Sequence, residues 1–306
     1  MSLTLFENLR AVFYAPFYAT EALGAFAAEG LQIRLVTSPS PAETASSLLD
    51  GTADVSWGGP MRVLLTYDRQ PDCDLVLFGE AVTRDPFFLV GRAAKPDFRL
   101  ADLVRARLGS VSEVPTPWLC LQDDLRRAGL DPSKLERVAG QTMAENAAAL
   151  REGAIDVAQF YQPYVEELLQ DGAGHIWYAA ATRGPTAYTS FYTTRARLEG
   201  EPESCAALVR ALYRTQKWLV TAAPEAVAEA IGGYFPALAP ALLAACMGRY
   251  QALGVWNRTP VLPHQGFERL KAACLSGGLI RRDTGFEACV DNRFAEAALA
   301  ADPPSM

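Results

Sequence analysis

Two stretches of this 306-residue chain carry the same pattern. Residues 43–64 read ETASSLLDGTADVSWGGPMRVL, and residues 145–166 read ENAAALREGAIDVAQFYQPYVE. Each begins with Glu, continues with Ala and Leu at helical spacing, and reaches an acidic residue followed by Gly. Each then passes through Asp-Val into a short apolar run and a proline. The pattern predicts a helix, a buried strand and a second helix in both places.

Glycine and proline mark the ends of these predicted helices. Gly51 and Gly153 suit a helix C-terminus, because glycine adopts positive φ without strain. Pro60 and Pro163 suit a helix start, where the missing N–H group is not needed. A repeated α/β unit with a spacing of about 100 residues indicates two similar lobes, although chance similarity between two α/β units is the alternative.

One acidic residue recurs at the same place in both copies. Asp54 and Asp156 each stand directly before the predicted strand. Their matched positions favour a structural role at the strand, so we do not include them among the site residues.

Strands and helices alternate along the first 195 residues, with short loops that favour parallel sheets. We expect an α/β protein with a first lobe formed by residues 1–85, and a second lobe formed by 92–185. Extended runs near 86–91 and 186–194 are predicted to cross between the lobes as a hinge. Residues 195–306 are predicted to be mainly helical and to pack on lobe 1. Two hinged lobes form a cleft, and ligands of such sheets bind beyond the carboxyl ends of the strands.

Composition excludes several classes of protein. The net charge is −7, which does not favour nucleic acid as a partner. No run of about 18 apolar residues predicts membrane insertion. The six cysteines form no CxxC pair and the two histidines are far apart, so neither a metal site nor a cofactor is expected. The N-terminus lacks a signal-peptide pattern, which predicts the cytoplasm as the sequence stands, or the periplasm if a signal peptide was trimmed.

Three stretches resemble one known family. FYAPFYATEALGAFAAEGLQIRLV (13–36) resembles the opening of periplasmic-type solute-binding proteins, in the family of sulfonate/taurine-binding proteins, pyrimidine-precursor-binding proteins and thiamine-pyrimidine synthases. LLDGTADVSWGG (48–59) and ALREGAIDVAQFYQPY (149–164) are similar to the signatures of its two lobes. The resemblance covers about residues 5–195, and covers the tail loosely. It implies the two-lobed type II binding fold. Most members capture a small organic solute for an ABC importer, and some are enzymes.

The candidate ligand-binding residues are polar, aromatic and glycine residues on or beside loops at predicted strand ends. They are Asn8, Arg10, Tyr14, Trp57, Gly58, Gly59, Arg62, Glu80, Arg84, Ser112, Glu113, Thr116, Trp118, Tyr161, Gln162 and Tyr188.

Residue chemistry gives these candidates different expected roles. Arginines at positions 10, 62 and 84 would supply positive charge, although Arg62 is equally suited to a solvated surface. Two glycines ahead of a helix, Gly58 and Gly59, leave N–H groups that can bind an anion or simply form a tight turn. Aromatic residues at positions 57, 118 and 161 would stack on a planar ligand, with core packing as the alternative.

We therefore expect a solute-binding protein that captures a small planar or anionic organic molecule, with an ABC-importer permease as a further partner. No catalytic residue is proposed. The alternative is a cytoplasmic enzyme on the same fold, similar to thiamine-pyrimidine synthases or to desulfinases and decarboxylases. Desulfinases of this fold use a cysteine in the first loop, and residues 8–17 contain none.

Overall fold

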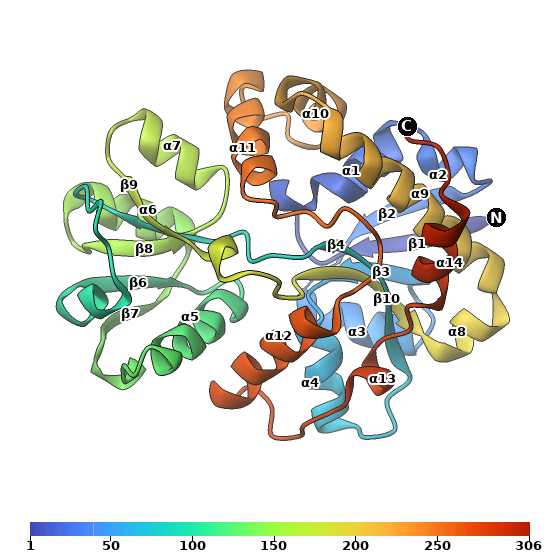
Figure 1. The fold of residues 1–306 in the computed structure, drawn as a ribbon, viewed down its shortest axis with the longest axis horizontal. Coiled ribbons are helices and arrows are strands. Elements are labelled where there is room, and N and C mark those ends of the chain that lie inside the picture. The colour runs from blue at the N-terminus through green and yellow to red at the C-terminus, as the bar shows by residue number, and fades with distance from the viewer. Residues whose placement is uncertain (39) are drawn as a thin grey trace.

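The described residues, 1–38 and 40–306 of the computed structural model, form two five-stranded sheets (Figure 1). The sheet of lobe 1 has the order β2-β1-β3-β10-β4, and its strands are β1 (Ser2–Glu7), β2 (Gln32–Thr37), β3 (Val55–Gly58), β4 (Leu75–Val82) and β10 (Thr189–Thr194). The sheet of lobe 2 has the order β7-β6-β8-β5-β9, and its strands are β5 (Phe88–Gly91), β6 (Arg107–Val111), β7 (Glu136–Gln141), β8 (Val157–Phe160) and β9 (His175–Ala179).

Both sheets have the same connectivity, which confirms the predicted two-lobed α/β fold. In lobe 1, β1 pairs in parallel with β2 and β3, and the antiparallel strand β10 lies between β3 and β4. In lobe 2, β6 pairs in parallel with β7 and β8, and the antiparallel strand β5 lies between β8 and β9. The predicted parallel pairing is wrong for one strand of each sheet, β10 or β5, because that strand enters directly from the other lobe.

The repeated stretch occupies equivalent places in the two lobes. Its first copy forms α3 (Pro41–Leu49), β3 and α4 (Met61–Arg69), and its second forms α6 (Met143–Glu152), β8 and α7 (Tyr164–Gln170). Asp54 Oδ2 accepts a hydrogen bond from the backbone N–H of Thr4 at 2.6 Å. Asp156 Oδ2 accepts the equivalent bond from Arg107 at 2.8 Å. Each aspartate thus joins the start of its strand to the neighbouring parallel strand, β1 in lobe 1 and β6 in lobe 2, so the predicted structural role is confirmed.

The chain passes between the lobes at two places. Residues 83–87 join β4 to β5, and residues 180–188 join β9 to β10. The extended runs near 86–91 and 186–194 include β5 and β10, so most of each run lies within a sheet. The second crossing begins with the short helix η4 (Ala180–Arg183).

The remaining helices surround the sheets. Those of the N-terminal half are η1 (Val12–Tyr14), α1 (Ala15–Ala22), α2 (Ala25–Ala28), η2 (Leu100–Arg105), α5 (Thr116–Arg127) and η3 (Pro132–Lys134). Those of the C-terminal part are α8 (Arg195–Gly200), α9 (Pro202–Thr221), α10 (Pro224–Ile231), η5 (Gly232–Tyr234), α11 (Pro240–Ala252), α12 (His264–Ser276), α13 (Phe286–Cys289) and α14 (Arg293–Ala301).

The C-terminal helices pack mainly on lobe 1, as predicted, and two of them also contact lobe 2. Helix α9 packs against α1 and α2, and α14 packs against α9. Helix α12 packs along α5, and α11 contacts α7, as Figure 1 shows on opposite sides of the crossings. The C-terminal part of the chain therefore links the two lobes in addition to the crossings.

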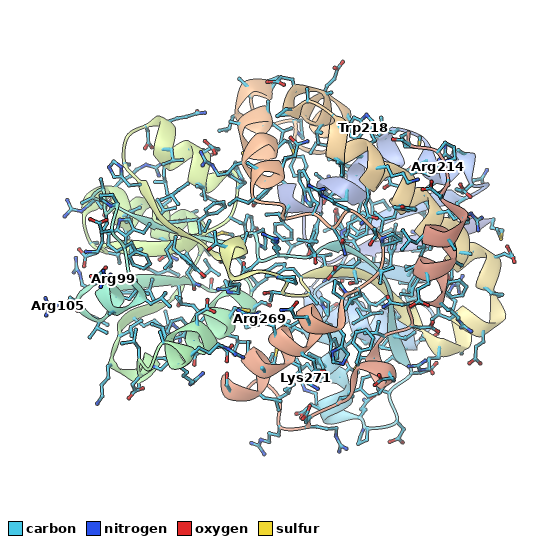
Figure 2. The ribbon with its side chains drawn as sticks, in the orientation of Figure 1. Arg99, Arg105, Arg214, Trp218, Arg269 and Lys271 are labelled. Carbon is cyan, nitrogen blue, oxygen red and sulfur yellow. The ribbon has the colours of Figure 1, made fainter. Side chains whose placement is uncertain are left out.

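Side chains fill the interior of both lobes (Figure 2). Trp57, Phe17 and Phe191 lie in the largest cluster of buried apolar residues and are fully or almost fully buried. This core extends from lobe 1 into lobe 2, where it includes Leu150 and Phe160. Within the described parts of the chain, no helix is both long and apolar in the way that crossing a membrane requires.

Candidate functional site

A cavity lies between the lobes, where the carboxyl ends of four strands meet the two crossings. Its volume is about 40 Å³, which is room for about three water molecules. The loops after β1, β3, β6 and β8 and both crossings line it, with the residues Asn8, Leu9, Phe13, Tyr14, Gly59, Met61, Arg62, Phe87, Val114, Thr116, Tyr161 and Tyr188.

Aromatic rings from both lobes form much of the cavity wall. The ring of Phe13 meets those of Tyr161 and Tyr188 edge to face, with centroid distances of 5.2 and 5.9 Å. Phe87, on the first crossing, meets Tyr161 in the same way at 5.1 Å. Such contacts position the rings firmly. The wall therefore joins lobe 1, lobe 2 and the crossings into one apolar surface.

Arg62 is the cation of the cavity. It lies in the first turn of α4, and its Nε is buried without a hydrogen-bond partner among the described residues. Burial lowers the pKa of Arg62, and the titratable groups around it are Arg69 and two neutral tyrosines rather than a carboxylate. A partly desolvated guanidinium with no anionic partner among the described residues favours binding of an anion from solution.

The backbone before Arg62 adds to this preference. Gly59 lines the cavity directly ahead of α4, a nine-residue helix that begins at Met61. The N-terminus of a helix carries partial positive charge, and its first N–H groups point outwards. The start of α4 and the guanidinium of Arg62 thus both favour an anion in the cavity.

Hydroxyl groups supply further hydrogen-bonding capacity. The hydroxyl of Tyr188 is buried and has no partner among the described residues. Burial raises the pKa of Tyr188 well above its ordinary value, and raises the pKa values of Tyr14 and Tyr161 in the same way. All three therefore keep their protons at neutral pH and can donate. Thr116 Oγ1 lies 3.7 Å from the sulfur of Met61, which brings the starts of α5 and α4 together across the cavity.

Asn8 is held in place from two sides. Its Oδ1 accepts a hydrogen bond from the hydroxyl of Tyr192 at 3.3 Å. A Cβ atom on Gly58 would lie 1.9 Å from Asn8 Nδ2, so the amide packs against the bare backbone of Gly58. Gly58 thus acts on the cavity through Asn8.

The structure brings seven of the sixteen predicted residues together around this cavity: Asn8, Tyr14, Gly59, Arg62, Thr116, Tyr161 and Tyr188. It places nine outside the lining: Arg10, Trp57, Gly58, Glu80, Arg84, Ser112, Glu113, Trp118 and Gln162.

Two of these nine have partners within lobe 1. Arg10 forms an ion pair with the buried carboxylate of Glu7 at 2.5 Å and lies over the ring of Tyr18. Trp57 stacks on Phe17 at 4.6 Å and is 1% exposed, so it is a core residue.

Glu80 and Arg84 contact the C-terminal part of the chain. Glu80 Oε2 accepts a hydrogen bond from Asn257 at 2.6 Å, and Oε1 is buried without a partner among the described residues. Burial raises the pKa of Glu80 to about 8. Arg84 donates to the carbonyl of Leu253.

The remaining predicted residues serve lobe 2. Trp118 lies under the guanidinium of Arg137. Glu113 accepts a hydrogen bond from the backbone N–H of Met143 at 2.8 Å, at the start of α6. Gln162 is fully buried and bonds to Glu166, and the backbone N–H of Ser112 donates to the carbonyl of Gln141.

The candidate list did not include the apolar part of the lining, which consists of Leu9, Phe13, Met61, Phe87 and Val114. Leu9, Phe13, Met61 and Val114 are close in sequence to polar candidates at strand ends, so their positions carried a usable signal. Phe87 is on a crossing, and nothing in its local sequence separates it from a core residue.

Metal-binding and nucleophilic groups do not contribute to the cavity. The described residues contain no group of three or more His, Cys, Asp or Glu side chains that can hold a metal ion. All six cysteines are buried and unpaired, and none lines the cavity. Burial raises the pKa of Cys120 well above the ordinary value, so it is a poor nucleophile.

Known proteins share this fold over nearly the whole chain. The periplasmic aliphatic sulphonate binding protein SsuA of Escherichia coli superposes with a TM-score of 0.74 at 16% identity, over 94% of this chain and 96% of that one. The desulfurization enzyme DszB superposes with a TM-score of 0.71 at 16% identity, over 98% and 99% of the two chains. The fold is therefore that of two-lobed periplasmic binding proteins, as predicted.

Sequence comparison identifies the family. YtlA of Bacillus subtilis (strain 168), described as a candidate binding protein, is 22% identical over 95% of this chain and 87% of its own length. A model of the family described as NMT1/THI5 like matches residues 13–226. That match spans more than half of the chain and includes the aromatic opening and both repeated stretches. This chain belongs to the NMT1/THI5-like family, which agrees with the resemblance found in its sequence.

Proposed function

We propose that this protein is a solute-binding protein that closes its two lobes on a small organic anion. The buried Nε of Arg62 in the interlobe cavity, which has no hydrogen-bond partner among the described residues, is the observation that carries the proposal. A cation that is desolvated without a partner lowers the stability of the free protein. A bound anion offsets this loss, so the charge of Arg62 stabilises the complex and not the free protein.

The rest of the lining indicates what the anion carries. Phe13, Phe87 and Val114 offer apolar surface, while the hydroxyl of Tyr188 offers one further donor to an oxygen of the ligand. A sulfonate or carboxylate on a short aliphatic or aromatic body matches this combination. The cavity of about 40 Å³ is too small for such a body, so ligand entry requires the lobes to separate.

Relatives of the same fold support this ligand class. The Escherichia coli relative is named for binding aliphatic sulphonates. The cavity of the present chain offers a cation and apolar surface, which suit a ligand with an anionic headgroup and an apolar body. We propose that the permease of an ABC importer receives the ligand from this protein.

We propose binding without covalent chemistry. The residues that line the described cavity include no thiol, imidazole or carboxylate that can act as a nucleophile or general base. The relative DszB is named as a desulfurization enzyme. The ligand recovered from the binding experiment must therefore be analysed for conversion.

Calorimetric titration with matched pairs of ligands tests the proposal. Short-chain and aromatic sulfonates and carboxylates are compared with their neutral amides, which have similar shape and no charge. We expect binding of at least one anion and none of its amide. The Arg62→Gln substitution should then weaken binding of that anion by about 10- to 100-fold, which is the range expected for loss of one charged hydrogen bond.

Arg69→Gln is the matched control, because Arg69 is on the same helix and its side chain is exposed. It should leave affinity unchanged. Equal affinity of Arg62→Gln and the parent protein for the anion, or preference for the neutral amide, would overturn the proposal. Recovery of a chemically altered ligand would replace it with an enzymatic function.

A further inference from the structure

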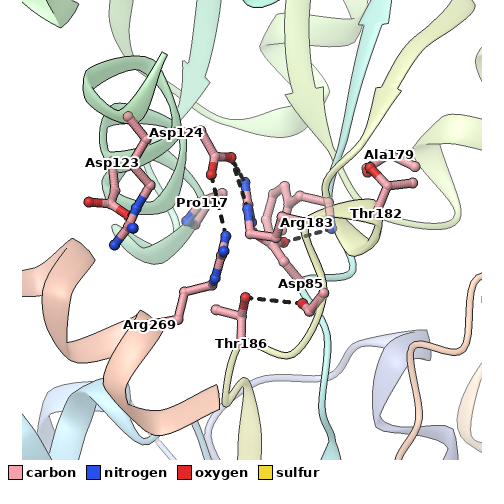
Figure 3. Close-up of polar contacts among 12 residues, drawn as sticks. Asp85, Pro117, Asp123, Asp124, Ala179, Thr182, Arg183, Thr186 and Arg269 are labelled. Carbon is pink, nitrogen blue, oxygen red and sulfur yellow. Dashed lines mark hydrogen bonds and ion pairs between the residues drawn. The ribbon is translucent and has the colours of Figure 1, made fainter. Parts of the chain in front are cut away.

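A cluster of charged side chains connects four segments of the chain, namely the two crossings, α5 and α12. Arg183, at the start of the second crossing, pairs with Asp85 of the first crossing and with Asp124 of α5, each at 2.5 Å. The side chains of these three residues are between 1% and 9% exposed. Figure 3 shows Asp124 between Arg183 and Arg269. Arg269 belongs to α12, and its Nη1 lies 3.8 Å from Asp124 Oδ1.

Counting the charges shows what Arg269 contributes. Asp85, Arg183 and Asp124 alone comprise two carboxylates and one guanidinium, which leaves one uncompensated negative charge. Arg269 supplies the second positive charge, and the cluster becomes neutral. An uncompensated charge in a buried position is unfavourable. The first three residues lie on lobe 2 and the crossings, whereas Arg269 lies on a helix that packs on lobe 1 as well.

The surroundings of this contact belong to both lobes. Near Asp124, the Ser276 hydroxyl of α12 donates to Asp123 of α5 at 3.4 Å, and Arg126 of α5 donates to Ser276 at 3.4 Å. Both of these contacts are longer than the pairs that Arg183 makes. Arg269 is 27% exposed, so water can replace Asp124 as its partner when α12 moves. Of the charges in the cluster, that of Arg269 is therefore the one that lobe separation can remove.

We propose that Arg269 is a positioning residue for lobe closure, which holds α12 of lobe 1 against Asp124 of lobe 2 and so favours the closed state before any ligand binds. Separation of the lobes would leave Asp124 with Arg183 and take Arg269 away. The proposal rests on the proposed function only for its effect on ligand affinity. Its effect on the lobes can be measured without a ligand.

The distance between the lobes tests this proposal. Spin labels at Val104→Cys in lobe 2 and Val220→Cys in lobe 1 use exposed positions, and the native cysteines are all buried. We expect a short interlobe distance in the parent protein without ligand. Arg269→Gln should reduce the ratio of closed to open molecules by about two- to fivefold, as expected for loss of one partly exposed ion pair. Arg269→Lys should restore part of the ratio.

Lys271→Gln is the matched control. Lys271 is on the same helix (Figure 2), and its ion-pair partners Glu268 and Asp283 both lie on the C-terminal part of the chain. It should leave the distance unchanged, whereas a structural defect in α12 would affect both variants. An unchanged distance in Arg269→Gln overturns this proposal. A changed distance together with failure of every anion to bind overturns the proposed function and leaves the role of Arg269 in place.

Discussion

The side-chain amide of Asn8 lies against the Cα of Gly58, so closely that a methyl group on Gly58 would be 1.9 Å from Asn8 Nδ2. Asn8 follows β1 and Gly58 ends β3, and the two strands are neighbours in the sheet. The bare backbone of Gly58 therefore decides where a polar group of the cavity points.

Gly58→Ala should weaken ligand binding by displacing Asn8. The expected loss is up to about tenfold, the value of one neutral hydrogen bond. Titration of the single variants Gly58→Ala and Asn8→Ala and of the double variant measures it. Because both act through the Asn8 amide, the double variant should bind no more weakly than the weaker single variant. Additive losses would show that Gly58 acts in another way.

Arg62→Met should raise the thermal stability of the ligand-free protein. The substitution removes a desolvated charge without a described partner and keeps a long apolar side chain at the start of α4. We expect an increase in Tm of about 1–3 °C, which corresponds to roughly 1 kcal/mol or less. Calorimetry without ligand checks this. A lower Tm would mean that Arg62 stabilises the folded chain even without a bound anion.

Arg183→Met should destabilise the protein strongly, because it leaves Asp85 and Asp124 buried without their shared partner. Breaking a buried ion pair from one side costs about 3–5 kcal/mol. Urea unfolding measures the loss. Arg127→Met is the control, since its pair with Asp123 is on the same helix and its side chain is 54% exposed. That variant should lose less than about 1 kcal/mol. Similar losses in both would contradict the buried cluster.

Glu80 should make stability depend on pH. Burial raises the pKa of Glu80 to about 8 in the folded protein, above its ordinary value of 4.5. The folded state therefore binds the proton more tightly than the unfolded state. The stability that this supplies is full below pH 4.5 and is lost as pH rises through 8, with a slope that approaches about 1.4 kcal/mol per pH unit.

Glu80→Gln should remove this pH dependence, because the amide stays neutral and can keep the hydrogen bond with Asn257. Between pH 5 and 9, the free energy of unfolding of the variant should increase relative to that of the parent as the pH rises. Parallel curves over that range would place the carboxylate of Glu80 in its charged form in the folded state.

Much of the fold could be predicted because its signals are local. Helix-ending glycines, helix-starting prolines and the matched aspartates Asp54 and Asp156 depend on a few neighbouring residues. The antiparallel placement of β5 and β10 could not be predicted, because their partners are far away in the sequence. An apolar strand has the same composition whether it crosses between the lobes or joins a sheet.

The site was harder to predict for the same reason. Asn8, Arg62 and Tyr161 follow strands, and the rule that ligands bind at strand carboxyl ends places them in the cavity. Arg10 also follows a strand, but its side chain pairs with Glu7 and does not line the cavity. Nothing in the local sequence predicts that pairing. Trp57 is within β3, where its ring packs on Phe17 in the core.

The strand order of lobe 1 has a consequence for synthesis on the ribosome. Strand β4 is made before lobe 2, yet its only sheet neighbour among the described strands is β10, which is made after it. The five strands of lobe 2 are contiguous in sequence, so that sheet can form as soon as β9 has emerged. A nascent chain must therefore hold the apolar strand β4 unpaired while about a hundred further residues are translated, and the half that is synthesised first completes its sheet last.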